Sequence, residues 1–99
     1  MIATDIGLTV QTVTPEVAGD LGLPKDAKGV VINVIAPDSR AAKADLQVGD
    51  VITQVRYKGK ETAIESTDDF GGALSNIPEN DAFSVLRTRE GTAKLVRIE

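Results

Sequence analysis

The chain of 99 residues contains no cysteine and no histidine. Without cysteine it can form neither a disulfide nor a thiolate metal site, although this absence does not reveal the compartment. Without histidine it lacks the commonest general base and the commonest metal ligand, and therefore any Ser-His-Asp or Cys-His catalytic arrangement of its own. A stand-alone enzyme is for this reason the least favoured functional class. No residue pattern indicates a metal site or a cofactor.

Aromatic residues and long apolar runs are also scarce. Tyr57, Phe70 and Phe83 are the only aromatics, so the core must be mainly aliphatic. No apolar run approaches the roughly 20 residues that a membrane-spanning helix needs. The formal net charge of −4 argues against nucleic acid or an anionic membrane as a partner. The length predicts one domain over residues 1–99, and since a strand begins almost at once, we expect it to be part of a longer protein.

The stretch from Thr4 to Val13 carries the strongest functional signal. Gly7 precedes an alternating run in which Leu8 and Val10 share one face, and this period of two predicts a half-buried β-strand. Glycine permits a positive φ, which can turn backbone N–H groups toward a guest. Such a nest beside a free strand edge can hold a carboxylate and then pair with the attached peptide. The residues therefore favour a module that captures peptide C-termini.

Three segments carry helix signals. Thr14 as N-cap, Pro15 at the first position and Gly22 at the C-terminal end predict a short covering helix. Ser39 can cap a second short helix over residues 40–44. Ser66 begins a third helix that runs to residue 76. The apolar stripe of the first helix comprises Val17, Ala18 and Leu21, and that of the third comprises Phe70, Ala73, Leu74 and Ile77.

Two features of the third helix allow alternatives. Asp68 and Asp69 can serve acid/base chemistry or a metal, but without a third ligand we favour helix capping. Gly71 and Gly72 each cost the helix roughly 1 kcal/mol relative to alanine. Such a cost indicates close approach, either of a ligand lying along the helix or of a strand packed under it, and the residues favour neither. Asp50 resembles a catalytic acid less than a turn residue bonded to nearby backbone N–H groups.

The other segments predict strands at residues 29–35, 51–55, 82–87 and 92–98, the first of them buried on both faces and the last two forming a hairpin. Residues 56–65 are expected to contain a hairpin tip or an irregular loop. The fold class is therefore α+β and mainly β. We expect a partly open β-barrel or sandwich of five to six strands, capped by two or three short helices.

These residues resemble a PDZ domain of the bacterial kind, most closely those of the HtrA/Do (DegP-like) serine proteases. The resemblance covers essentially the whole chain and implies the permuted strand order of bacterial PDZ domains. Asp38, Arg40 and Asp45 stand where the family has Gly, Pro and Gly, and Asp45 is expected to keep a left-handed conformation. The matching segments are Gly7-Leu8 with its strand, residues 29–32, residues 37–46, Gly49-Asp50-Val51-Ile52, and Asp69-Phe70 with Ala73-Leu74.

The resemblance also implies a binding geometry. The carboxylate-binding loop comprises Asp5, Ile6, Gly7 and Leu8. The strand that pairs with the peptide comprises Thr9, Val10, Gln11 and Thr12. On the helix, the residues that face the peptide and its last side chain are Leu74, Gly71, Thr67 and Ser75, while Ile6, Leu8 and Val10 complete the pocket.

By the same resemblance, the chain is a non-catalytic module that regulates a trypsin-like serine endopeptidase of protein quality control, or feeds substrate to it. It would capture hydrophobic C-termini or extended segments of unfolded polypeptide in the periplasm or cell envelope. Its further partners would be the protease domain and a neighbouring PDZ domain. The alternative is a structural PDZ domain, such as the second of a tandem, that joins domains or subunits without binding free peptides.

Overall fold

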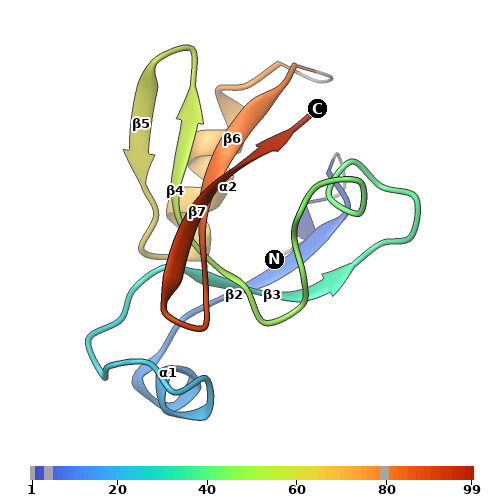
Figure 1. The fold of residues 1–99 in the computed structure, drawn as a ribbon. Helices are drawn as coiled ribbons and strands as arrows, with labels where there is room; N and C mark the ends of the chain where they lie inside the picture. Colours follow the sequence, from blue (N-terminus) through green and yellow to red (C-terminus); the bar gives the residue numbers. More distant parts are fainter. Residues whose placement is uncertain (1, 4–5, 79–80) are drawn as a thin grey trace.

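The computed structural model describes residues 2–3, 6–78 and 81–99, which form one antiparallel β-sheet and two helices (Figure 1). The strand order is β1-β2-β3-β4-β6-β7, and β5 pairs with β4 beside this path. The sheet does not close into a barrel, so the expectation of a partly open, mainly β fold is confirmed. The elements are β1 (Ile2–Ala3), β2 (Leu8–Thr12), α1 (Pro15–Asp20), β3 (Val30–Ile35), β4 (Val51–Tyr57), β5 (Lys60–Ala63), α2 (Thr67–Ser75), β6 (Phe83–Arg89) and β7 (Thr92–Ile98).

Helix α1 begins and ends where the sequence predicts. The Thr14 hydroxyl accepts from the Val17 N–H at 3.2 Å, and Pro15 occupies the first helical position, where a missing N–H costs nothing. Gly22 follows the helix with φ of +73°. The predicted apolar stripe is too long, however. Ala18 is buried, whereas Leu21 lies at the C-cap and is 37% exposed.

Helix α2 confirms the capping interpretation of its aspartates. The Ser66 hydroxyl accepts from the Asp69 N–H at 3.2 Å, and the Asp69 carboxylate accepts from the Glu65 N–H at 3.0 Å. Phe70 and Ala73 face the core and are buried. No described part of the chain approaches Gly72 closely, because a Cβ placed there would meet nothing within 4 Å. The interpretation of a helix packed tightly on a strand is therefore wrong for Gly72, and that of a ligand lying along the helix stays a prediction.

The connection from Ala36 to Asp50 departs most from expectation. Residues 40–44 form successive turns rather than an α-helix. Ser39 nevertheless caps this segment, since its hydroxyl accepts from the Ala42 N–H at 3.1 Å. The non-glycine residue with a left-handed backbone here is Asp38, with φ of 62°, and not Asp45. The Asp38 turn, rather than a helix end at Asp45, sets the path of the chain.

Two hydrophobic clusters cover the two faces of β3. Val30 and Ile32 lie in the main cluster under α2, while Val31 packs with Val13 and Ala18 under α1. The prediction of a strand buried on both faces holds for this half only. In the second half Val34 is 53% exposed, because α1 covers the sheet only near the start of β3.

Both predicted hairpins form as tight turns. Lys58 and Gly59 join β4 to β5 with φ of 49° and 79°, and Glu90 and Gly91 join β6 to β7 with φ of 51° and 80°. Two consecutive positive φ values match the mirror-image turns whose twist suits adjacent antiparallel strands. Residues 56–65 are therefore a hairpin, one of the two alternatives open from the sequence.

Candidate functional site

The backbone at Ile6 and Gly7 is held from one side by the Ala36–Asp50 connection. The Ala41 N–H donates to the Ile6 carbonyl at 2.9 Å, and the Ala36 N–H donates to the Gly7 carbonyl at 2.8 Å. In a planar trans peptide the next N–H points opposite to the carbonyl. The N–H groups of Gly7 and Leu8 are therefore turned away from the connection. Two adjacent N–H groups aimed the same way are what a carboxylate needs.

Gly7 has a structural reason to be glycine. Its φ is +82°, a conformation that residues with a Cβ rarely adopt. A Cβ at this position would also overlap the Cβ and hydroxyl of Ser39. Both the backbone angle and the close packing on Ser39 therefore require glycine, as the sequence pattern predicted for the angle alone.

Strand β2 has one edge on β3 and a second edge facing away from it. The Gly7 carbonyl accepts from the Ala36 N–H at 2.8 Å, and the Val13 N–H donates to the Gly29 carbonyl at 2.9 Å. Backbone polar groups of successive residues alternate between the two edges of a strand. The odd-numbered residues of β2 therefore direct their backbone N–H and carbonyl groups to β3. Those of Leu8, Val10 and Thr12 face the other edge, where a peptide would have to add.

Strand β1 lies on this second edge. Leu8 and Thr9 pair with Ile35 and Val34 of β3, and the same two residues pair with Ala3 and Ile2 of β1. A strand has only two edges, so β1 and β3 flank β2 on opposite sides. The described part of β1 pairs with Leu8 and Thr9 alone.

Helix α2 packs beside β2 and is tied to its end. The Thr67 N–H donates to the Thr12 hydroxyl at 3.0 Å, so the last position of the predicted pairing strand fixes the start of the helix. Leu74 packs against the main hydrophobic cluster and keeps part of its surface exposed. Gly71 is half-buried, and the exposed Ser75 donates through its hydroxyl to the Gly72 carbonyl at 2.7 Å.

The other predicted site residues differ in exposure. Ile6, Leu8 and Val10 are at most 1% exposed and belong to the main cluster. Thr9 is half-buried, and Gln11 is exposed and accepts through its amide oxygen from Asn33 across the sheet at 2.9 Å. Asp5 lies outside the described residues. The structure thus brings Ile6 to Thr12 beside α2, with their aliphatic side chains turned inward.

Arg40 ties the Ala36–Asp50 connection to distant parts of the chain. Its guanidinium donates to the backbone carbonyls of Glu99 at 2.8 Å and Asp81 at 2.6 Å. The guanidinium carbon also lies 5.8 Å from the centre of the Phe83 ring. These contacts hold the segment that in turn holds Ile6 and Gly7.

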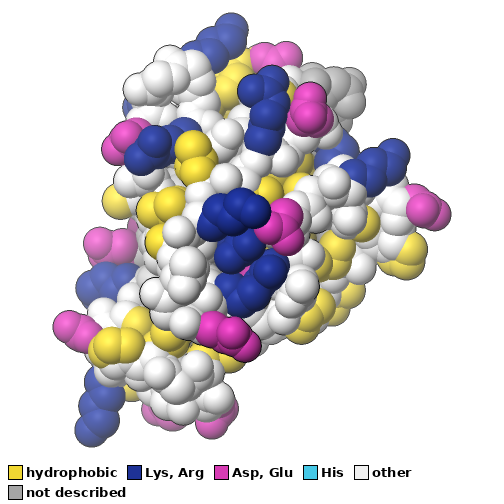
Figure 2. All heavy atoms as spheres, viewed as in Figure 1, with side chains coloured by type: hydrophobic (Ala, Val, Ile, Leu, Met, Phe, Trp, Pro, Cys, Tyr) yellow, Lys and Arg dark blue, Asp and Glu magenta, His cyan; other side chains and the backbone are white. Residues whose placement is uncertain are grey.

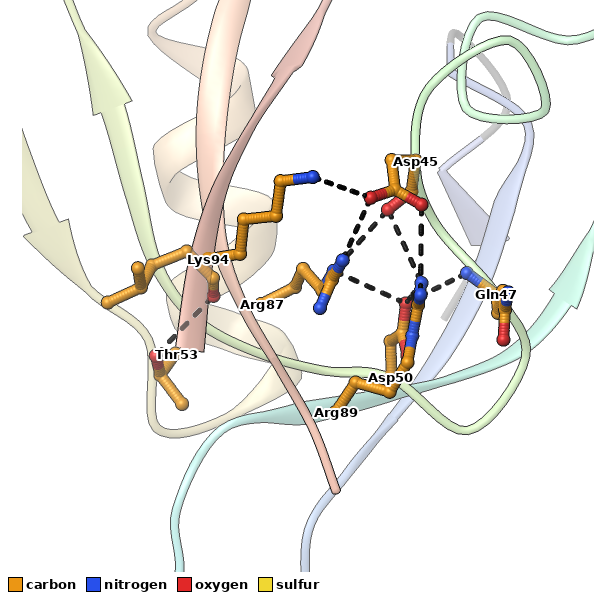
Figure 3. A network of polar contacts seen from close by, with 8 residues as sticks. Asp45, Gln47, Asp50, Thr53, Arg87, Arg89 and Lys94 are labelled. Atoms are coloured by element: carbon orange, nitrogen blue, oxygen red, sulfur yellow. Dashed lines mark hydrogen bonds and ion pairs between the residues drawn. The ribbon is translucent and has the colours of Figure 1, made fainter. Parts of the chain in front are cut away.

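A second anchor of the connection is a cluster of charged side chains shown in Figure 3. Asp50, only 2% exposed, accepts two hydrogen bonds from Arg89 and one from the Gln47 N–H, each at 2.8 Å. Arg87 is 5% exposed and donates to Asp45 at 2.9 Å. The hydrogen bond from the Gln47 N–H confirms the predicted turn role of Asp50. Asp50 also forms an ion pair with Arg89 of β6, which the local sequence did not indicate.

Asp45 lies at the solvent side of this cluster. Hydrogen bonds from Lys94 and then Arg87 lower the pKa of its carboxyl below the ordinary value of 3.8. The Lys94 ammonium is 3.0 Å from the Asp45 carboxylate. Figure 2 shows the basic side chains gathered at the middle of this face with acidic groups against them. Each basic side chain of the cluster has a carboxylate partner within it, which suits an anchor better than an anion site.

Sequence reasoning missed the parts that support the loop. Ala36, Ser39 and Ala41 hold Ile6 and Gly7, but small residues in a turn give no signal for such a long-range role. The contribution of β1 was missed too, since two residues are too short for a recognisable period. In the part of the chain that the structure describes, no group of three potential metal-binding side chains comes together, and neither helix is long and apolar enough to cross a membrane.

Comparisons with known proteins agree with this geometry. No protein-family model matches the chain. Over 93 residues it is 29% identical to a probable periplasmic serine endoprotease, DegP-like, of Brucella suis, covering 94% of this chain and 17% of that protein. A protein of the same description from Chlamydia pneumoniae is 37% identical over 60 residues, covering 61% of this chain and 12% of that protein.

A solved structure adds the fold. The HtrA-type protease AlgW, determined with a decapeptide, matches 95% of this chain and 27% of its own with a TM-score of 0.77 and 26% identity. The chain is a homologue of the DegP-like proteases with the fold of an HtrA PDZ domain. It spans only 12–17% of the length of these curated relatives. A PDZ-like module of this kind is thus one part of a longer protease in the relatives.

Proposed function

We propose that this PDZ domain captures peptides by strand addition along β2, reading the terminal carboxylate with the N–H groups of Gly7 and Leu8. The observation that carries the proposal is the pair of hydrogen bonds from Ala41 and Ala36, which fix the carbonyls of Ile6 and Gly7 and so aim these N–H groups. A carboxylate bonded to two N–H groups gains charge-assisted hydrogen bonds.

The apolar residues around the loop favour a hydrophobic last side chain. Ile6, Leu8 and Val10 are buried in the main cluster beneath β2, and Leu74 keeps part of its surface exposed on α2. Thr67, Gly71 and Ser75 would contact residues further upstream in the peptide. The ligands we propose are hydrophobic protein C-termini and extended segments of unfolded polypeptide.

We propose further that the domain belongs to a longer protease. The relatives are named periplasmic serine endoproteases, so the parent would be a trypsin-like serine endopeptidase of the periplasm. There this domain would regulate the protease or deliver substrate to it, contacting the protease domain and a neighbouring PDZ domain. The chain itself would supply no catalytic residue.

A structural PDZ domain is the second candidate, and one observation favours it. Strand β1 already pairs with Leu8 and Thr9, where the end of a peptide would add. A domain whose edge stays covered would join domains or subunits without taking free peptides.

Binding of labelled ten-residue peptides separates the two candidates. Peptides ending in Val, Leu or Phe should bind as free acids with a Kd in the micromolar range, about −8 kcal/mol at 1 μM, because one added strand with one anchor pocket offers little more. The C-terminal amides should bind at least tenfold more weakly. Absence of binding to every free acid, by fluorescence anisotropy up to millimolar protein, would favour the structural candidate.

The variant Leu74→Asp tests the position of the pocket. A carboxylate in an apolar pocket wall should abolish binding of the free acids. Leu95→Asp is the matched control, since Leu95 lies on β7 and is 45% exposed. It should bind as the unchanged protein does. Retained binding by a folded Leu74→Asp variant would show that the peptide lies elsewhere.

A further inference from the structure

We propose that β1 acts as an internal ligand, which competes with incoming peptides for the edge of β2. This inference rests on the proposed function and adds how the same site is regulated. Its starting point is the register: Ala3 and Ile2 pair with Leu8 and Thr9 on the edge opposite β3. These are the positions next to the Gly7 and Leu8 N–H groups that would receive the end of a peptide.

The direction of β1 also matches that of a ligand. Strand β1 is antiparallel to β2, and its chain runs toward the loop at Ile6 and Gly7. A peptide whose carboxylate binds that loop must run antiparallel to β2 with its C-terminus at the same end. The two strands would therefore occupy the same backbone positions in the same direction. They cannot pair with Leu8 at the same time.

The strength of this competition follows from the small size of β1. Of the two residues of β1, only Ala3 pairs with a residue whose backbone polar groups point to this edge. That residue is Leu8. A strand tethered to its own acceptor pairs at a high effective concentration. Few bonds, however, make the closed state only modestly favoured, so β1 should weaken peptide binding by about tenfold rather than prevent it.

The alternation along β2 supplies a matched pair of variants. Ala3→Pro removes the N–H that faces Leu8, and it should open the edge. Ile2→Pro introduces the same residue one position away. Ile2 pairs with Thr9, whose polar groups point to β3, so the N–H of Ile2 is not directed at β2. The pair thus separates the loss of the strand from the general effect of proline.

The experiment uses the full chain and the labelled free-acid peptide ending in Val, Leu or Phe that binds most tightly. Ala3→Pro should bind it about tenfold more tightly than the unchanged chain, and Ile2→Pro should bind it with unchanged affinity. In a parallel NMR titration of the unchanged chain, the amide signals of Ile2 and Ala3 should move to random-coil positions as the peptide saturates the domain.

Two outcomes would overturn the inference, and they differ in what else they reject. Equal affinities of Ala3→Pro and the unchanged chain, or strand-like shifts of Ile2 and Ala3 at saturation, would reject the internal ligand and leave the peptide-binding function in place. Absence of binding by every variant, Ala3→Pro included, would reject both.

Discussion

Asp50 combines a buried carboxylate with a position at the start of β4. Its partner Arg89 approaches with two nitrogens, and the pKa of this guanidinium is raised further by the hydrogen bond to Asp50. Such a pair is a weak source of stability as a whole, but removing one partner leaves a charge without compensation. We infer that the cluster fixes the end of the Ala36–Asp50 connection, whose other end holds the loop at Ile6 and Gly7.

We predict that Asp50→Asn lowers the free energy of unfolding by about 3 kcal/mol, because Arg89 loses its buried counter-charge. Glu61→Gln is the control. Glu61 pairs with Arg56, both side chains are at least 41% exposed, and the loss of this pair should cost less than about 1 kcal/mol. Urea unfolding followed by circular dichroism measures both. Similar small losses in the two variants would mean that the buried pair does not anchor the connection.

Tyr57 provides a second prediction at this scale. Its hydroxyl donates to the Asp81 carboxylate at 2.5 Å, and this bond raises the pKa of Tyr57 above its ordinary value of 10.0. Since the folded-state pKa exceeds the unfolded one, the bond stabilises the fold fully below pH 10 and is lost as pH rises through the folded-state value.

The stability difference between the unchanged chain and Tyr57→Phe should therefore be constant from about pH 7 to 9 and shrink above pH 10. Urea unfolding of both proteins across this range gives the difference directly, and other titrating groups cancel in it. A difference that grows above pH 10 would show that the ionised tyrosine is the favoured form in the fold.

Among the elements, α2 tests how far the sequence determines local structure. Gly72 lies within the helix, where glycine is unfavourable, and a Cβ there would meet nothing within 4 Å. We predict that Gly72→Ala stabilises the domain by about 0.5–1 kcal/mol. Gly22→Ala makes the same chemical change at φ of +73°, where a Cβ costs about 1 kcal/mol, and should destabilise it. Thermal unfolding should show Tm shifts of opposite sign, and a loss of stability in Gly72→Ala would contradict the open surroundings of that residue.

The elements that the sequence predicts correctly are those determined by residues close to them in the chain. The caps at Thr14 and Ser66, the two tight hairpins and the glycine at position 7 all depend on neighbours within a few residues, and the structure confirms them. The turns at residues 40–44 were predicted as a helix because Ser39 offers a local N-cap. The segment instead meets Ile6 through the Ala41 N–H, a contact that the local sequence does not show.

The candidate site was predictable to a similar extent. Gly7 and the alternation after it indicated a strand edge beside a nest of N–H groups. What aims those groups is a contact across about 30 residues of chain, from Ala36 and Ala41 to the loop, and no periodicity reports it. The pairing of β1 with β2 was not predictable either, because a strand of two residues has too short a pattern to specify its register.

At the scale of the whole molecule, three regions of the fold are linked by direct contacts. The charged cluster and Arg40 hold the Ala36–Asp50 connection, the connection holds Ile6 and Gly7, and β2 then extends from this loop along α2. In the DegP-like relatives the matching segment is part of a longer protein.

The central claim is that the Gly7 and Leu8 N–H groups read a carboxylate at the edge of β2. An amide NMR titration tests it most directly, with peptides ending in Val, Leu or Phe supplied as free acids and as C-terminal amides. We predict shifts that cluster at residues 6–13 and 67–75 for the free acids only. Equal shifts with both forms would contradict carboxylate reading, and no shifts with either would contradict peptide capture altogether.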